Sequence, residues 1–169
     1  MRRPRLALAA AAVGLALSAS GCAYLNPVQT HEFYQAADGT NANLEESGRL
    51  MAGVRNAIVV LPEEGDPVLF GAVANYTTEE MTVELEGTSE GTVVFSGRVS
   101  VPAGATVNLG VGENAQQVPI GQIDVPAGAN MALTVTANGQ STEITLPVTD
   151  TSLEYYRDAV EGAGEGATS

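Results

Sequence analysis

Residues 131–146 read Met-Ala-Leu-Thr-Val-Thr-Ala-Asn-Gly-Gln-Ser-Thr-Glu-Ile-Thr-Leu, and this stretch decides the fold class. Two alternating runs flank Asn138-Gly139, the dipeptide most typical of a two-residue type I′ hairpin turn. Such a turn pairs Ala137 with Gln140 and so fixes the register of both strands. The stretch therefore predicts an antiparallel hairpin whose pairing can be written residue by residue.

This register separates apolar pairs from polar pairs. One face carries Met131 with Leu146, Leu133 with Ile144 and Val135 with Thr142, and the other carries Ala132 with Thr145, Thr134 with Glu143 and Thr136 with Ser141. Apolar pairs on one side and polar pairs on the other are typical of a sheet with one buried face.

Further strands are predicted on the N-terminal side of this hairpin. Residues 57–61 and 68–74 are almost continuously apolar, which favours central strands, and the turn 62–67 separates them. Around 118–125 we expect a weak edge strand, broken by Pro119 and Gly121. A second hairpin is expected, with a loop at 87–91. Its side chains expected to point inward are Met81, Val83, Leu85, Val93, Phe95, Val99 and Val101, and a further inward set is Val107, Leu109 and Val111.

Seven or eight short strands in about 100 residues predict an all-β fold, an immunoglobulin-like antiparallel β-sandwich over residues 49–148. The pentapeptide Val-Pro-Ala-Gly-Ala occurs at 101–105 and 125–129. We interpret it as one turn chemistry used twice before a strand, rather than as a structural repeat.

The pattern changes after Pro147. Thr151-Ser152-Leu153-Glu154 fits a capping box, which predicts a short C-terminal helix within residues 149–161. Leu153, Tyr156 and Val160 share one stripe, which we expect to pack on the edge of the sandwich; a partner's groove is the alternative. Residues 162–169 are expected to be disordered.

The N-terminus has the pattern of a bacterial targeting segment. Arg2, Arg3 and Arg5 precede the apolar run 6–17. Twelve residues rise about 18 Å as a helix, too short for a hydrocarbon core of about 30 Å. Residues 1–21 are therefore predicted to be a cleaved signal peptide rather than a membrane span.

Ala19-Ser20-Gly21-Cys22 resembles the lipobox of bacterial lipoproteins, with Ala19 where Leu is usual. The resemblance implies cleavage before Cys22 and transfer of a diacylglyceryl group to its thiol. A thiolate is the strongest nucleophile that the chain offers for this step, and two acyl chains anchor a protein stably. The alternative is a secreted protein in which Cys22 is incidental.

Residues 22–48 are predicted to be the lipidated cysteine and a tether. No period of 2 or 3.6 runs through them, and Asn26-Pro27 and Asp38-Gly39 are turn signals. We expect Phe33 and Tyr34 to pin the second half of the tether onto the domain, with a partner-binding segment as the alternative.

The charge of the chain excludes one large class of function. The 169 residues include 20 acidic and 7 basic side chains, no Lys, and a formal net charge of −13. Loss of residues 1–21 removes three Arg and leaves 4 − 20 = −16. Nucleic-acid binding needs a basic face, so no nucleic acid is expected as a partner. Anionic headgroups would repel such a domain, so we expect its body to stand off the membrane.

The side chains offer little for catalysis. His31 is the only histidine and Cys22 the only cysteine, so neither a Ser-His-Asp nor a Cys-His arrangement is expected. A pair of carboxylates remains open among the 20 acids. We expect no catalytic residues, no cofactor and no enzymatic activity.

Metal binding was weighed for two cations. Soft ligands for Cu(I) would be His31, Met51, Met81 and Met131, but Met81 and Met131 fall on predicted inward faces. Calcium could be held by Glu63, Glu64 and Asp66 or by Glu79-Glu80, yet neither set has the spacing of a calcium loop. We therefore expect no metal site.

The order of features resembles the LpqE-type family of actinobacterial cell-surface lipoproteins. The resemblance rests on the lipobox, on the Val-Pro-Ala-Gly segments, and on residues 37–42 (Ala-Asp-Gly-Thr-Asn-Ala), 54–60 (Val-Arg-Asn-Ala-Ile-Val-Val) and 71–77 (Gly-Ala-Val-Ala-Asn-Tyr-Thr). It implies a lipid-anchored sandwich akin to the periplasmic copper chaperones without their ligand motif. It also implies partners among envelope or respiratory membrane complexes.

Two functional hypotheses follow. The first is a membrane-anchored, non-enzymatic interaction or accessory module, held by Cys22 on the extracytoplasmic face of the cell membrane. The second is a periplasmic carrier of copper or of a small ligand.

Overall fold

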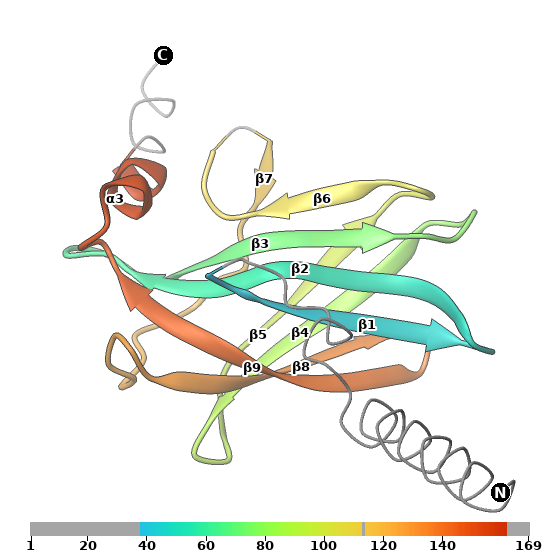
Figure 1. The fold of residues 1–169 in the computed structure, drawn as a ribbon, viewed down its shortest axis with the longest axis horizontal. Helices are drawn as coiled ribbons and strands as arrows, with labels where there is room; N and C mark the ends of the chain where they lie inside the picture. Colours follow the sequence, from blue (N-terminus) through green and yellow to red (C-terminus); the bar gives the residue numbers. More distant parts are fainter. Residues whose placement is uncertain (1–37, 113, 162–169) are drawn as a thin grey trace, which may run out of the picture. The chain divides into compact units, whose positions relative to one another are not determined.

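The computed structural model describes residues 38–112 and 114–161, which form nine strands and one short helix (Figure 1). The predicted signal peptide, the predicted lipidation site Cys22, most of the predicted tether and the C-terminal residues 162–169 lie outside the described residues. The elements are β1 (Thr40–Glu46), β2 (Arg49–Leu61), β3 (Val68–Asn75), β4 (Met81–Ser89), β5 (Thr92–Val101), β6 (Thr106–Leu109), β7 (Ala115–Gln116), β8 (Asn130–Ala137), β9 (Gln140–Asp150) and α3 (Glu154–Glu161).

The strands form one curled, mixed sheet in the order β5-β4-β8-β9-β2-β3-β6-β7, with β1 also paired to β2. The all-β prediction is confirmed. The prediction of a wholly antiparallel arrangement is wrong, because β2 and β9 run parallel, as do β6 and β7. The structure also has nine strands in the described residues where seven or eight were predicted.

The long strand β9 makes the sheet curl. Its first part, Gln140–Pro147, pairs with β8, and its last residues, Val148–Asp150, pair with β2. Strands β4 and β5 consequently cross behind β1, β2 and β3 (Figure 1). One core fills the space between the two layers, and its largest wholly buried side chains come from both of them: Leu69, Val73, Val83, Leu85, Val99, Leu133 and Leu146.

The hairpin predicted over residues 131–146 is confirmed in every pair. Ala137 faces Gln140, Leu133 faces Ile144, and the inward side chains of β8 are buried. Asn138 and Gly139 have φ values of 47° and 77°, the left-handed conformation that a type I′ turn requires.

The second hairpin is confirmed, but its turn differs from the prediction. β4 continues to Ser89, and Glu90 and Gly91 alone form the turn, with φ values of 50° and 77°. The pairing shifts between Gly87 and Thr88, so Val94 is an extra residue in β5. The bulge reverses the alternation before it. The prediction that Val93 points inward is therefore wrong, and its side chain is 52% exposed.

The β-structure begins earlier than predicted. Residues 40–46, assigned to the tether, form β1 and pair with β2 through a two-residue turn at Ser47-Gly48. Ala42 and Leu44 are buried in the main core. The tether prediction is therefore wrong for residues 40–46. The sequence did not indicate this strand because only two of its residues point inward and its other side chains are polar.

The expected edge strand at 118–125 does not form. The segment has no regular secondary structure, although Val118, Ile120 and Val125 are buried in the core. Pro119 has no N–H to give to a ladder. The segment instead covers the core beside β5, where Val118 lies against Gly97.

The two Val-Pro-Ala-Gly-Ala segments form the same turn before β6 and before β8, as predicted. In each, the alanine N–H after the glycine donates to the proline carbonyl, Ala105 to Pro102 and Ala129 to Pro126, both at 3.1 Å.

The C-terminal helix forms, but it begins later and packs elsewhere than predicted. β9 extends to Asp150, and the first helical bond runs from the Arg157 N–H to the Leu153 carbonyl at 3.2 Å. Thr151 therefore does not cap the helix. Tyr156 packs with Ile58 and Val60 on the outer face of β2, not on the sheet edge. Leu153 was expected in the buried stripe and is 49% exposed.

The register of the first hairpin can be tested by a matched pair of substitutions. Leu133 is fully buried and Thr134, its neighbour, points to the other face. Leu133→Ala should lower the free energy of unfolding by about 2–5 kcal/mol, and Thr134→Ala by less than about 1 kcal/mol. Urea denaturation of both variants measures the difference, and equal losses would contradict the assigned faces.

Candidate interaction surface

The methionines considered as copper ligands are all buried in the described part of the chain. Met51, Met81 and Met131 are 2%, 4% and 4% exposed and all pack into the main core, which confirms the core prediction for Met81 and Met131. The Met51 sulfur accepts a hydrogen bond from the Asn138 amide at 3.8 Å. Cys22 and His31 lie outside the described residues.

The acidic candidates for calcium lie on exposed turns. Within residues 38–112 and 114–161, no group of three or more His, Cys, Asp or Glu side chains is placed to hold a metal ion. Glu63, Glu64 and Asp66 are all exposed. Glu80 accepts a hydrogen bond from the Ser100 hydroxyl at 3.0 Å.

Asp38 connects the first described residues to the C-terminal helix. Its carboxylate accepts hydrogen bonds from the hydroxyls of Tyr155 and Tyr156, the latter at 3.2 Å. The two rings lie 4.1 Å apart between centroids. The helix is thus fastened at both sides, to the sheet by the Tyr156 ring and to Asp38 by the two phenols.

A bulge in β2 fixes the position of Asp38. Asn56 has a φ of 51°, and its side-chain oxygen accepts a hydrogen bond from the Gly39 N–H at 2.9 Å. The Asn56 N–H donates to the Asn41 side chain at 3.0 Å. Gly39 packs so tightly here that a Cβ would lie 2.5 Å from the Asn56 backbone. Asp38, the residue before Gly39, is therefore held at a fixed point beside β2.

The surroundings of the two tyrosines favour their neutral form. Burial of its ring raises the pKa of Tyr156 well above the ordinary 10.0, and the neighbouring Tyr155 hydroxyl and Asp38 carboxylate add to this rise. The hydrogen bond to Asp38 raises the pKa of Tyr155. A phenolate at either position would face the Asp38 carboxylate.

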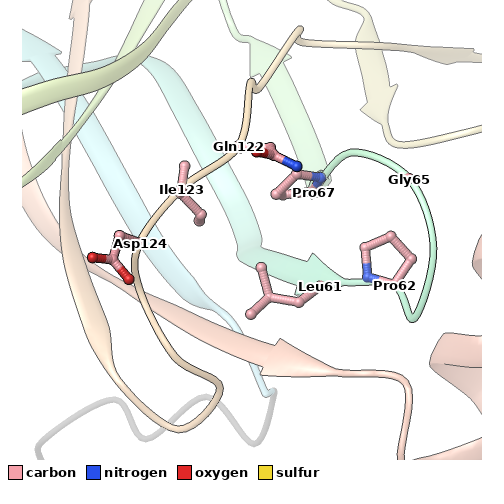
Figure 2. Close-up of a pocket in the computed structure, with 7 residues that line it drawn as sticks. All are labelled: Leu61, Pro62, Gly65, Pro67, Gln122, Ile123 and Asp124. Atoms are coloured by element: carbon pink, nitrogen blue, oxygen red, sulfur yellow. The ribbon is translucent and has the colours of Figure 1, made fainter.

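A shallow pocket lies at the end of β2. Its volume is about 450 Å³, and its lining comes from the loop between β2 and β3 and from the strandless segment 117–126. Figure 2 shows Leu61 and Ile123 facing the pocket from these two sides, with Pro62 and Pro67 at the two ends of the loop. Gln122 and Asp124 supply the polar part of the lining.

Two further pockets adjoin the same loop. One of about 270 Å³ lies between Glu63, Glu64 and the helix residues Arg157 and Val160. Another of about 480 Å³ is lined by Asp66, Pro67 and residues 117–121. The loop 62–67 thus stands between three hollows at one end of the sheet.

The sequence carries no local signal for this surface. The loop 62–67 was predicted as a turn, but the pocket depends on residues 122–124, about sixty positions away, and no pattern relates the two segments. The contact of Asp38 with Tyr155 and Tyr156 spans more than a hundred residues. Its one local signal was a pair of adjacent tyrosines on a short helix.

Comparison with protein-family models and with curated proteins finds no match. None of the helices in the described part of the chain is both long and apolar enough to cross a membrane. The surface must therefore be interpreted from its own geometry and charge.

The tyrosine contact predicts how stability depends on alkaline pH. Folding raises the pKa of Tyr156 above its ordinary value of 10.0. The contribution of Tyr156 to the free energy of unfolding is therefore fully present below about pH 10 and is lost as the pH rises further. Between about pH 8 and pH 11 the native chain should lose more stability than Tyr156→Phe. Denaturant unfolding at both pH values measures this. The control Tyr76→Phe removes a half-exposed phenol and should keep the full loss.

Burial of the methionines also predicts how the chain treats copper. Cu(I) should bind the native chain no more tightly than a His31→Ala, Met51→Leu double variant, because a soft-metal site needs two to four ligands around one ion and the core holds the sulfurs apart from solvent. Competition with a chromogenic Cu(I) chelator measures the affinity. Tight one-to-one binding that the double variant loses would establish the carrier hypothesis instead.

Proposed function

We propose that this protein is a lipoprotein anchored through Cys22 to the extracytoplasmic face of the cell membrane, where it acts as a non-enzymatic interaction or accessory module. The observation that carries the proposal is the N-terminal pattern of three arginines, a twelve-residue apolar run and Ala-Ser-Gly-Cys at 19–22. A diacylglyceryl group on Cys22 would be the membrane contact.

The proposal limits how far the domain can lie from the membrane. Fifteen residues separate Cys22 from Asp38, the first described residue. Fifteen extended residues reach at most about 50 Å. With a net charge of −16 after cleavage, the domain would be repelled by anionic headgroups and held within that distance.

The LpqE-type resemblance supports the same proposal. The segments that carry it, 37–42, 54–60 and 71–77, fall at β1, β2 and β3, which form one side of the curled sheet. We regard the fold as a variant of the immunoglobulin-like sandwich, since two strand layers enclose one core. The partners proposed by the resemblance are envelope or respiratory membrane complexes.

The carrier alternative has less support from the described residues. Its soft ligands would include Met51, Met81 and Met131, and all three are buried in the main core. An interaction module needs no such site, because a surface with exposed apolar side chains is enough. Tyr155 on the helix and Leu153 just before it, 50% and 49% exposed, are of this kind.

The anchor is tested by Cys22→Ser with Ser18→Ala as the matched control. A hydroxyl cannot replace the thiolate as acceptor, so Cys22→Ser should move the protein from the membrane fraction to the soluble fraction, while Ser18→Ala should leave it in the membrane. Mass spectrometry of the mature N-terminus reports acylation directly. Membrane association of Cys22→Ser, together with an unacylated native N-terminus, would refute the proposal. If the native chain is anchored, purification from mild-detergent extracts should retain a membrane complex.

A further inference from the structure

The pocket between the loop 62–67 and the segment 117–126 has an apolar floor. Leu61 and Ile123 are partly buried, both pack against the main core, and both face the pocket (Figure 2). Pro62 and Pro67 add two rigid apolar walls. An aliphatic side chain placed between Leu61 and Ile123 would remove apolar surface from water on both.

One carboxylate lies in this pocket and three more lie on the loop beside it. Asp124 lines the pocket itself, and Glu63, Glu64 and Asp66 stand on the adjoining loop. In residues 38–112 and 114–161 the one ion pair is Arg98 with Glu84, so none of these four carboxylates is neutralised by an arginine. Arg157 lines the neighbouring pocket, but it donates to the Thr151 carbonyl at 3.2 Å.

The segment beside the pocket is not part of the sheet. Residues 117–125 take part in none of the backbone hydrogen bonds that join the loops and turns of the described chain. They belong to no strand. An extended chain laid along this segment would pair with those of its N–H and C=O groups that face outward, as in strand addition.

From these three observations we propose that the end of the sheet around Leu61 and Ile123 binds an extended, basic segment of a partner protein. An aliphatic side chain of that segment occupies the pocket, and its Lys or Arg side chains meet the carboxylates of the loop 62–67 and Asp124. The charge of the chain favours such a partner. A formal net charge of −13, which becomes −16 once the predicted signal peptide is removed, attracts cationic chains and repels anionic ones.

This inference extends the proposed function by naming the chemistry of the partner, and its test is independent of the anchor. Binding is measured on the full acylated chain in an uncharged detergent. A failure here would leave the result for Cys22 unchanged, and a failure of the anchor would leave this pocket to be tested on the same domain.

The probes are three capped heptapeptides labelled with a fluorophore, and their anisotropy reports binding. The first alternates Lys and Val, the second alternates Lys and Ser, and the third alternates Glu and Val. The native chain should bind the first peptide more tightly than the second and should not bind the third. Equal affinity for the first and second would show attraction by charge alone and would overturn the role of the pocket.

Two variants locate the site. Glu63→Gln, Glu64→Gln, Asp66→Asn removes three exposed charges and should weaken the Lys-Val peptide by about tenfold, as expected for three surface ion pairs. The matched control Glu45→Gln, Glu46→Gln, Glu143→Gln removes three exposed charges elsewhere and should change the affinity much less. Equal effects of the two triple variants would contradict the proposal.

Ile123→Thr tests the floor, with Val93→Thr as its control on an exposed position of β5. Loss of one apolar contact should weaken the Lys-Val peptide about fivefold, and the control should not. The melting temperature of Ile123→Thr is measured alongside. If the variant is folded and binds as the native chain does, the pocket is not the site; if it is unfolded, the charge variants decide the question.

Discussion

The parallel pairing of the end of β9 with the end of β2 is the constraint on which the rest of the structure depends. Val59, Val60 and Leu61 lie beside Val148, Thr149 and Asp150, the three residues of β9 that follow its last pair with β8 at Pro147. This pairing joins the two layers through one continuous strand and closes the core between them. It also brings the loop 62–67 and the helix α3 to the same end of the sheet, because each follows directly from one of the paired strand ends.

The parts of the fold that the sequence predicts are those with a local signal. Asn138-Gly139 gave a turn, a register and a buried face, because Asn and Gly adopt the left-handed conformation readily. Ser47-Gly48 and Glu90-Gly91 adopt the same conformation, yet Ser and Glu have no strong preference for it. The turn at Ser47-Gly48 was missed, and with it β1. The turn at Glu90-Gly91 was placed within a longer loop at 87–91, which cut off the end of β4. The parallel pair of β2 and β9 joins residues about ninety positions apart and leaves no periodic signal.

The candidate surface shows the same division. The burial of Met81 and Met131 was predicted from the alternation within each of their strands, and it is confirmed. The stripe of the C-terminal helix was right for Tyr156 and wrong for Leu153, because β9 extends four residues beyond the predicted strand end at Leu146 and delays the start of the helix. The pocket between Leu61 and Ile123 arises where a proline-containing segment fails to pair as a strand, and sequence patterns describe regular elements better than such gaps.

Hydrogen exchange of the backbone amides in the full chain is the measurement that tests the central claim most directly. If β9 holds both layers together, the amides of residues 148–150 and 59–61 should exchange as slowly as those of β8, because all of them open only when the whole domain unfolds. Fast exchange at 148–150 and 59–61, with β8 still protected, would show that the two layers open separately. In that case β9 would not be the element that fixes the position of the loop 62–67 and the pocket beside it.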